Sequence, residues 1–223
     1  ATPNTHILLS RAGMLSPTGR CRTFDNAADG FVPGECVAAV VLKPLDAALR
    51  DGNPIHAVIR ASGINQDGRT NGITAPSAPS QTHLIRDLYE KAGIAPDSLD
   101  YIETHGTGTK LGDPIEVAAL TDAFKGRVPN DWSCGLGSVK TNIGHTMEAS
   151  GMASLIKVLL CLRHEELVSS LHFVQANEHI EFAKSPFRVT TENQSWPRRT
   201  DPRRAAISSF GMSGTNVHIV IEE

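Results

Sequence analysis

Three short segments contain the residues whose types and spacing could do chemistry. They read Glu-Thr-His-Gly-Thr-Gly-Thr at 103–109, Ser-Val-Lys-Thr-Asn-Ile-Gly-His at 138–145 and Ser-Ser-Phe-Gly-Met-Ser-Gly-Thr-Asn at 208–216. They place His105, His145 and Lys140 beside turns rich in Gly, Ser, Thr or Asn. A neutral imidazole can donate a hydrogen bond to a developing oxyanion, and an ammonium group adds positive charge. The set is therefore suited to stabilising negative charge on a carbonyl or a decarboxylating acid, although the segments contain no convincing nucleophile.

The two histidines have the same local arrangement. Each follows an apolar run, stands in a polar turn next to glycine, and precedes a helical pattern. One such histidine alone would favour a structural role, but the repetition weakens that interpretation. Loops that leave the carboxyl ends of strands are where open α/β sheets generally place chemistry. We therefore expect His105 and His145 to meet in one pocket, with Lys140 pointing inward behind them rather than into solvent.

Other ligands fit these segments poorly. The run around His105 lacks the Gly-x-x-x-x-Gly-Lys-Ser/Thr spacing of a phosphate loop. The histidines form no close ligand pair and have no cysteine or acid at metal spacing, which disfavours zinc. For Phe210 with Gly211 and Gly214, two interpretations remain open. The glycines shape an oxyanion-hole turn guarded by Phe210, or the segment is a glycine-rich hairpin turn, which the pattern favours when taken alone.

The elements that must position these loops can be predicted from periodicity and turn residues. Apolar runs predict strands at 36–42, 57–64, 99–103, 135–139, 205–209 and 217–221, with a hairpin joining the last two. Helical patterns cover 45–50, 115–125 and 147–163, and a further helix begins at the N-cap Ser80 and ends at Gly93. Strands alternate with helices through the middle of the chain, so we predict an α/β fold with a mixed sheet.

Composition sets broad limits on function. The 223 residues are 40% hydrophobic and 20% charged, which is typical of a globular protein, and the net charge of -3 favours neither nucleic acid nor an anionic membrane. No apolar run reaches the ~18 residues of a membrane helix, and no signal-peptide pattern opens the chain. The cysteines suggest neither a metal site nor a disulfide scaffold, which favours a reducing, cytoplasmic setting. The start at Ala1 fits an excised or cleaved segment.

The motifs together resemble the β-ketoacyl synthase (ketosynthase) domains of modular polyketide synthases. The three segments above contribute, and so do Asp-Pro-Ile-Glu at 113–116, Cys-Arg-Thr-Phe-Asp at 21–25, Asn-Gln-Asp-Gly at 65–68 and Asn-Gly-Ile-Thr-Ala-Pro at 71–76. The resemblance runs in order from about residue 5 to the C-terminus. The segment 170–187 is most similar to synthases whose modules lack a built-in acyltransferase.

The resemblance implies a thiolase-like fold with five layers, α-β-α-β-α, built from two similar halves. Residues 1–45 would form the end of the first half, 53–168 the second half, and 169–223 a C-terminal extension with the closing strands. Most of the first half of the sheet would then lie outside this chain. The strand expected at 36–42 would expose unpaired edges unless another polypeptide covers it.

The resemblance also implies a reaction. An acyl chain passes from the phosphopantetheine arm of a carrier protein to a cysteine thiolate, a malonyl unit loses CO2, and the resulting enolate attacks the acyl thioester. His105 and His145 would assist decarboxylation and stabilise the enolate oxygen, while Lys140 would organise the site electrostatically. The substrate-binding candidates are Thr107 and Thr109 for the arm, Phe210 as a gate for malonyl entry, and Gly211 and Asn142. No covalently bound cofactor and no metal are expected.

The nucleophilic cysteine of the family lies upstream of this chain. It cannot be mapped onto Cys21, Cys36, Cys134 or Cys161, and Cys36 stands in a strand where glycine is usual, so packing is its expected role. The chain alone should therefore be unable to form the acyl-enzyme. The expected partners are an N-terminal ketosynthase part that carries the cysteine, an acyl carrier protein, and a second copy in a homodimer of the complete domain, with no nucleic acid and no membrane.

Two alternatives to an elongating ketosynthase remain. A non-elongating ketosynthase passes acyl chains along without condensing them, but loss of the histidine equivalent to His145 is the family's usual route to that state. A catalytically silent scaffold would hold dimer and carrier-protein contacts. The candidate contact surface of such a scaffold is a basic segment with Arg198, Arg199, Arg203 and Arg204. The same segment can also be interpreted as an ordinary solvated loop.

Overall fold

A six-stranded mixed sheet forms the centre of the computed structural model, which describes residues 2–72 and 74–223. The order across the sheet is β1 (Val58–Gln66), β8 (Thr215–Glu222), β7 (Arg204–Phe210), β2 (Tyr101–Glu103), β3 (Cys134–Gly137) and β5 (Phe187–Val189). Neighbours from β7 to β5 are parallel, whereas β8 runs antiparallel to both β1 and β7. The predicted mixed sheet and the closing hairpin are therefore both present.

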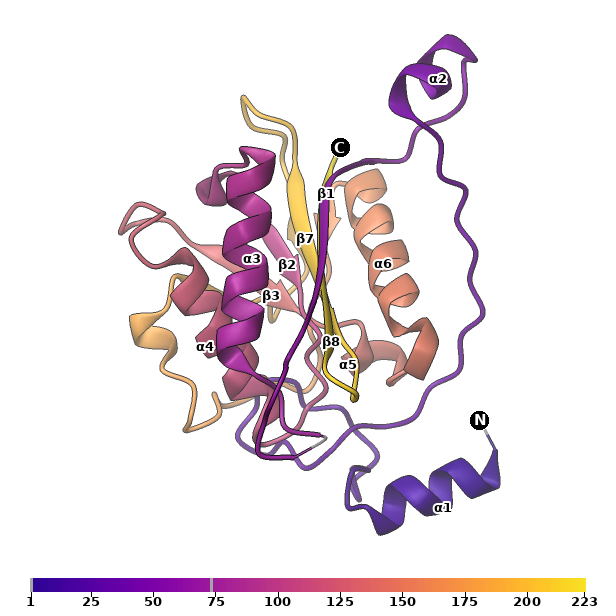
Figure 1. Cartoon of the computed structure of the whole chain (residues 1–223), viewed down its shortest axis with the longest axis vertical. Helices are drawn as coiled ribbons and strands as arrows, with labels where there is room; N and C mark the ends of the chain where they lie inside the picture. The colour runs from indigo at the N-terminus through magenta and orange to yellow at the C-terminus, as the bar shows by residue number, and fades with distance from the viewer. Residues whose placement is uncertain (1, 73) are drawn as a thin grey trace.

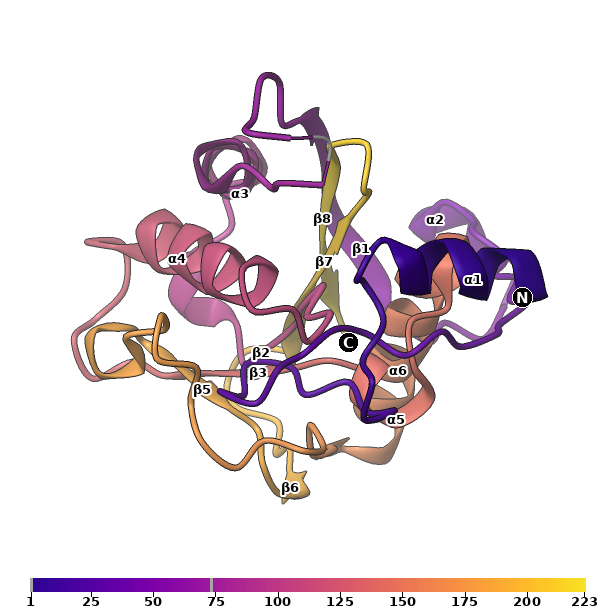
Figure 2. The same cartoon turned by 90° about the horizontal axis from the view of Figure 1, so that it is seen from below.

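Helices cover the two faces of this sheet. α3 (Ala78–Ala92) and α4 (Gly112–Phe124) lie on one face and α6 (Ser150–His164) on the other, which gives three layers (Figures 1 and 2). The remaining elements are short: α1 (Pro3–Arg11), α2 (Leu45–Arg50), α5 (Lys140–Ile143), η1 (Pro96–Ser98), η2 (Met147–Ala149), η3 (Phe182–Lys184), and the pair β4 (Glu166–Leu167) and β6 (Gln194–Ser195). α1 was not expected; its N-cap is Thr2, and it buries no side chain.

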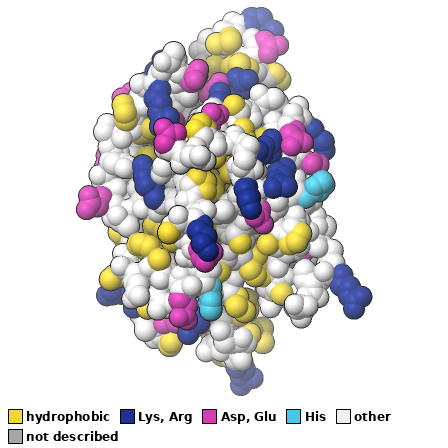
Figure 3. Space-filling model, turned by 90° about the vertical axis from the view of Figure 1, so that its left-hand side faces the viewer, with side chains coloured by type: hydrophobic (Ala, Val, Ile, Leu, Met, Phe, Trp, Pro, Cys, Tyr) yellow, Lys and Arg dark blue, Asp and Glu magenta, His cyan; other side chains and the backbone are white. Residues whose placement is uncertain are grey.

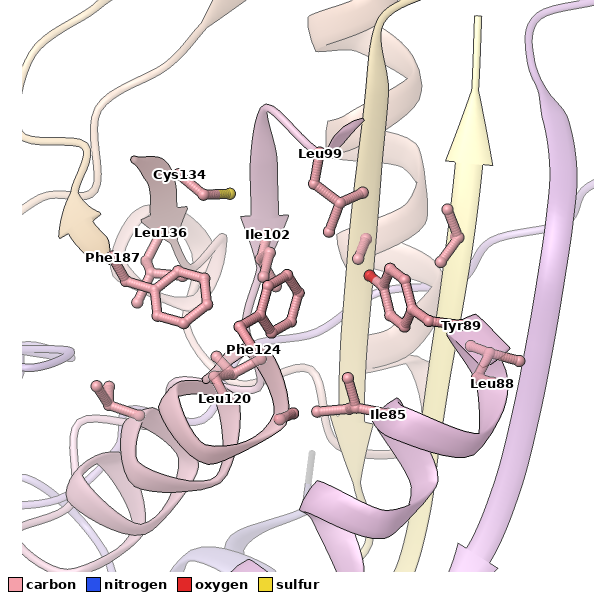
Figure 4. Packing of buried hydrophobic residues seen from close by; sticks show 14 of the residues in the cluster. Ile85, Leu88, Tyr89, Leu99, Ile102, Leu120, Phe124, Cys134, Leu136 and Phe187 are labelled. Carbon is pink, nitrogen blue, oxygen red and sulfur yellow. The ribbon is translucent and has the colours of Figure 1, made fainter. Parts of the chain in front are cut away.

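The hydrophobic core has two parts, one on each face. Between the sheet and the α3–α4 layer, Ile85 and Tyr89 meet Phe124 and the strand residues Ile102 and Leu136 (Figure 4). The second part packs α6 against the opposite face of the sheet, and its buried members include Val158, Cys161, Leu162, Ile207 and Ile221. Because both faces of the central strands are covered, β2 and β3 are buried at every position, the polar Glu103 included.

The start of α3 differs from the prediction by one turn. Ser77, not Ser80, is the N-cap: its backbone is extended and its hydroxyl accepts the Ser80 N–H at 3.3 Å. The helix can begin this early because Pro79 lies in the first turn, where its missing N–H costs nothing. The Ser80 hydroxyl instead donates to the carbonyl of Asp67 at 3.1 Å. The predicted end of the helix is confirmed, with Gly93 in the left-handed conformation at φ 62°.

The strand predicted at 36–42 is wrong for this structure. The run is extended but unpaired, and it passes out along the α6 side of the molecule to α2 (Figure 1). Val37 and Val41 are 102% and 95% exposed. Within the described ranges no strand lies beside this run to pair with its backbone groups, so the apolar composition alone cannot make it a strand.

The carboxyl ends of β2 and β3 lie at the same edge of the sheet because these strands are parallel. The loop with His105 leaves β2 there, and Lys140 follows β3 on α5. The N-terminal segment around residues 21–34 crosses the same edge (Figure 2). The fold thus brings three separate parts of the chain to one place.

The outer surface on the α3–α4 side has no single sign of charge. Lys and Arg side chains are interspersed with Asp and Glu across that face (Figure 3). Among the residues that the structure describes, no helix has the length and apolar character required to cross a membrane.

Candidate active site

Two carboxylates from the start of α4 hold the loop that carries His105. The oxygens Oε1 and Oε2 of Glu116 accept the backbone N–H groups of His105 and Gly106 at 2.7 and 2.8 Å. Asp113 accepts the N–H of Gly108 at 3.1 Å and that of Phe24 at 2.7 Å. From the sequence these acids were expected only in the first turn of a helix, and their contact with the His105 loop was not predicted.

Both carboxyl groups are buried, and burial disfavours their charged forms. It raises the pKa of Asp113 to about 6 and raises the pKa of Glu116 well above its ordinary value, even though the backbone N–H groups oppose the change. The loop around His105 therefore depends on two acids that titrate closer to neutrality than ordinary carboxylates.

The loop that carries His145 is held by the N-terminal segment. The N–H of His145 donates to the carbonyl of Val32 at 2.7 Å, and the carbonyl of His145 accepts the N–H of Gly34 at 2.9 Å. The ring of Phe31 lies 5.1 Å from the imidazole of His145, centroid to centroid. Gly144 must be glycine here, because its φ is +78° and a Cβ would lie 2.7 Å from the Val32 oxygen.

The two imidazoles meet as predicted. Their ring centroids are 5.6 Å apart with the rings nearly perpendicular, and Phe210 lies 5.5 Å from His105. All three side chains line one cavity of about 720 Å³. The predicted substrate-binding residues Thr107, Thr109 and Gly211 line the same cavity.

Backbone donors fix the tautomer of both rings. The N–H of Phe210 donates to Nδ1 of His105 at 3.3 Å, and the N–H of Met147 donates to Nδ1 of His145 at 3.1 Å. Because Nδ1 accepts in each ring, the proton of the neutral imidazole must reside on Nε2. Each ring therefore offers one Nε2–H donor.

Burial keeps both rings uncharged. It lowers the pKa of His105 well below 6.5 and that of His145 to about 3, and the nearby positive charge of Lys140 acts in the same direction. Both imidazoles are therefore neutral at physiological pH, where they can donate hydrogen bonds without transferring a proton.

Lys140 is buried behind the histidines, as predicted, but it does not line the cavity. Burial lowers its pKa, whereas Glu103 and Glu116 favour its charged form. Because Lys140 does not line the cavity, it acts on the histidines through space.

Glu103 joins several parts of the site: its Oε1 accepts the N–H of Val139 at 2.6 Å, and its Oε2 accepts from Lys157 at 2.8 Å.

Asn142 is a correction to the predicted site. Its side chain is exposed and lies in a second hollow of about 440 Å³, whose other residues include Cys36, Ile143, Leu160 and Cys161. A helical turn rotates side chains by about 100° per residue, so Asn142, two positions after the inward-facing Lys140, points away from the cavity.

Of the two interpretations of the Phe210 turn, the backbone contacts support the hairpin turn over the oxyanion hole. The N–H of Phe210 is taken by His105, that of Gly211 donates to Thr215 at 2.7 Å, and that of Gly214 donates to Gly211 at 2.9 Å. These three N–H groups are therefore occupied, and the segment is a hairpin turn that places the Phe210 ring at the cavity.

The four arginines considered as a carrier-protein contact are paired within the chain. Their carboxylate partners are Glu223 for Arg198, Asp100 for Arg199, Glu165 and Glu223 for Arg203, and Glu222 for Arg204. This segment is therefore not a free basic patch. Nowhere in 2–72 and 74–223 do three His, Cys, Asp or Glu side chains gather closely enough to hold a metal ion.

Three family descriptions match successive parts of the chain. "Beta-ketoacyl synthase, N-terminal domain" matches residues 1–48, "Beta-ketoacyl synthase, C-terminal domain" matches 56–174, and "Ketoacyl-synthetase C-terminal extension" matches 176–223. The fold and the matched residues thus define a domain of the thiolase-like class. The chain belongs to the β-ketoacyl synthase family.

Similar proteins are polyketide synthases. The chain is 56% identical over its whole length to polyketide synthase PksL of Bacillus subtilis and 49% identical over 97% of its length to polyketide synthase ThaG of Burkholderia thailandensis, covering 5% and 4% of those proteins. A solved ketosynthase from module 6 of the Bacillus subtilis bacillaene synthase superposes with a TM-score of 0.97 at 56% identity, and the Streptomyces albus oxazolomycin ketosynthase OzmH KS7 with 0.96 at 44%.

Both superpositions cover 100% of this chain and 40% of the solved chain. The resemblance to polyketide synthase ketosynthases and the thiolase-like fold are therefore confirmed. The chain contains three α/β/α layers of that architecture.

Proposed function

We propose that this chain is the C-terminal part of an elongating ketosynthase that catalyses decarboxylative Claisen condensation between an acyl-cysteine and a malonyl carrier protein. One observation carries the proposal: two neutral imidazoles from separate loops, each with its proton on Nε2, line one cavity. Such a donor pair matches a reaction in which negative charge develops on one oxygen.

The histidines would act in two bond changes. When the bond between the malonyl carboxylate and Cα breaks, CO2 leaves and the electron pair moves onto the thioester oxygen as an enolate. The Nε2–H groups of His105 and His145 donate to that oxygen and stabilise it without transferring a proton. The enolate carbon then forms a bond to the acyl carbon, and the cysteine thiolate leaves. The buried charge of Lys140 favours both anionic stages.

The other cavity residues would position the substrate. Thr107 and Thr109 have their hydroxyl oxygens 3.3 Å apart on the cavity wall, where they would bind the phosphopantetheine arm. Phe210, in contact with His105, would gate malonyl entry, and Gly211 lines the cavity beside it. The enzyme itself holds no covalent cofactor in this proposal, because the arm belongs to the carrier protein.

The nucleophile would come from the N-terminal ketosynthase part. Cys21, Cys134 and Cys161 are buried, and burial raises the pKa of each thiol, which disfavours a thiolate. The exposed run at 36–42 and the apolar hollow beside α6 would be covered by that part. The complete domain would act as a homodimer in the cytoplasm with an acyl carrier protein, and the segment 170–187 favours the type without a built-in acyltransferase.

Acylation and extension by the complete domain, with its N-terminal part, test this proposal. After incubation with an acyl thioester and then with malonyl carrier protein, mass spectrometry should show acylation of the upstream cysteine followed by a chain two carbons longer. Acylation without extension would identify a domain that only transfers, and absence of acylation would identify a scaffold.

The role of His145 is tested by comparing its alanine variant with an alanine variant at an exposed histidine. His145→Ala should abolish CO2 release from the malonyl thioester, whereas His83→Ala on the outer surface of α3, 74% exposed, should leave it unchanged. Equal CO2 release by the two variants would contradict the assigned role of His145.

A further inference from the structure

A buried ion pair lies on the α6 side of the site, outside the histidine cavity. Nζ of Lys157 on α6 is 2.8 Å from Oε2 of Glu103 at the end of β2, and the two side chains are 7% and 0% exposed. The hydroxyl of Tyr101 donates to the same Oε2 atom at 2.7 Å and accepts from Lys157 at 2.9 Å. The chain leaves room for this group, because a Cβ at Gly137 on β3 would collide with the Tyr101 hydroxyl.

Stability alone does not account for this pair. The desolvation of two opposite charges offsets much of their attraction, and apolar residues of similar volume are often at least as stable. The neighbouring core on this face of the sheet includes the apolar residues Val158, Cys161 and Ile207. A charged pair among such residues therefore points to a role in the site rather than in the core.

The other carboxylate oxygen of Glu103 connects the pair to the site. Oε1 accepts the N–H of Val139 at 2.6 Å, and the next residue, Lys140, is the first of α5. Glu103 itself lies two residues before His105. One carboxylate therefore joins the strand before His105 to the turn that carries Lys140, while Lys157 fixes its second oxygen from α6.

We propose that Glu103 and Lys157 form a positioning pair that holds the turn carrying Lys140 in place relative to His105. This inference rests on the proposed function, because it concerns the step in which negative charge develops at that site. Neither member of the pair lines the histidine cavity, so neither contacts the substrate. The pair should therefore affect kcat for CO2 release and leave KM for the malonyl carrier protein nearly unchanged.

Removal of the two charges, singly and together, tests the pair in the acylated complete domain. Glu103→Gln or Lys157→Met alone leaves one buried charge without its partner, so the contact with Val139 is disturbed. Each change should lower kcat for CO2 release at least about 10-fold. In the double variant the carboxamide can accept the Val139 N–H and donate to the Tyr101 hydroxyl. It should recover kcat to within about 3-fold of the unaltered enzyme, since the two changes act on one contact.

Two further variants control for folding and for charge. Tyr101→Phe keeps both charges and removes one donor to Oε2, so it applies even if a single charge variant does not fold. It should lower kcat about 3-fold or more with KM unchanged. Lys184→Met breaks an exposed pair in which Lys184 lies 2.9 Å from Glu181, and it should change neither constant.

Unchanged kcat in Tyr101→Phe, or in a folded single charge variant, would overturn the inference. So would a double variant in which the losses of the single variants add, or a loss that appears in KM rather than in kcat. Failure of the unaltered domain to release CO2 would instead overturn the proposed function and this inference with it.

Discussion

At the residue scale, the site depends on a buried carboxylate that accepts hydrogen bonds from the backbone N–H groups of the His105 loop. Glu116 uses both carboxylate oxygens to hold the N–H groups of His105 and Gly106, so the position of one imidazole depends on a side chain eleven residues away. Nothing in the composition of the His105 loop shows this, because the contact joins a side chain of α4 to the backbone of the loop.

Glu116→Gln tests this dependence. A carboxamide has one acceptor and one donor, so one of the two backbone N–H groups loses its partner at a cost of about 1–3 kcal/mol. We expect kcat/KM for condensation to fall about 10- to 100-fold while the fold remains intact by circular dichroism. Glu90→Gln, an exposed change on α3, is the control. Unchanged condensation by the Glu116 variant would show that the carboxylate does not position His105.

At the element scale, glycine residues allow loops to adopt backbone conformations and close contacts that other residues would not tolerate. Gly144 has a φ of +78° and lies against the backbone of Val32, whereas Gly52 has a φ of +64° with open space around it. The two positions share a positive φ, but Gly144 also has a ψ of 179°, a combination that essentially only glycine adopts, and its surroundings are crowded.

Alanine at each position measures how much the glycine-only backbone and the clash at Gly144 together add to the ordinary cost of a positive φ. Gly52→Ala should cost only the left-handed backbone term, about 1–2 kcal/mol, in the free energy of unfolding. Gly144→Ala adds a Cβ 2.7 Å from a carbonyl oxygen and should cost at least about 2 kcal/mol more, with loss of condensation because His145 is displaced. Denaturant titration of both variants measures the difference; equal costs would mean that the loop moves freely.

Much of the element order followed from the sequence. Apolar runs and caps predicted the strands beside the site, and the rule that chemistry gathers at the carboxyl ends of parallel strands predicted that His105 and His145 meet. Local patterns could not show that the run at 36–42 lacks a partner strand, that Asn142 turns away from the cavity, or that Glu103 pairs with Lys157. These three outcomes depend on contacts between segments distant in the sequence.

At the scale of the whole molecule, the chain leaves apolar surface on the α6 side. Val41 is 95% exposed in the run at 36–42, and Leu160 on α6 is 48% exposed beside the second hollow. The chain spans 40% of the length of the solved ketosynthases it matches. This combination supports the proposal that the N-terminal part covers this side in the complete domain.

Val41→Asp tests that coverage. If Val41 is buried in the complete domain, the change loses about 1.5–3 kcal/mol of apolar burial and adds a desolvated charge. We expect the midpoint of thermal unfolding of the complete domain to fall by about 5 °C or more. Val174→Asp, a change at another valine that is 91% exposed, should leave the midpoint nearly unchanged. The same small effect from both variants would contradict coverage of the 36–42 run.

The protonation state of the paired histidines tests the central claim most directly. Nitrogen-15 NMR of the imidazoles in the complete domain, recorded from pH 8 to pH 5, distinguishes the two tautomers and the imidazolium. Because burial lowers both pKa values, to about 3 for His145, lowering the pH to 5 should leave His105 and His145 neutral with the proton on Nε2. Protonation of either ring above pH 6, or a proton on Nδ1, would contradict the account.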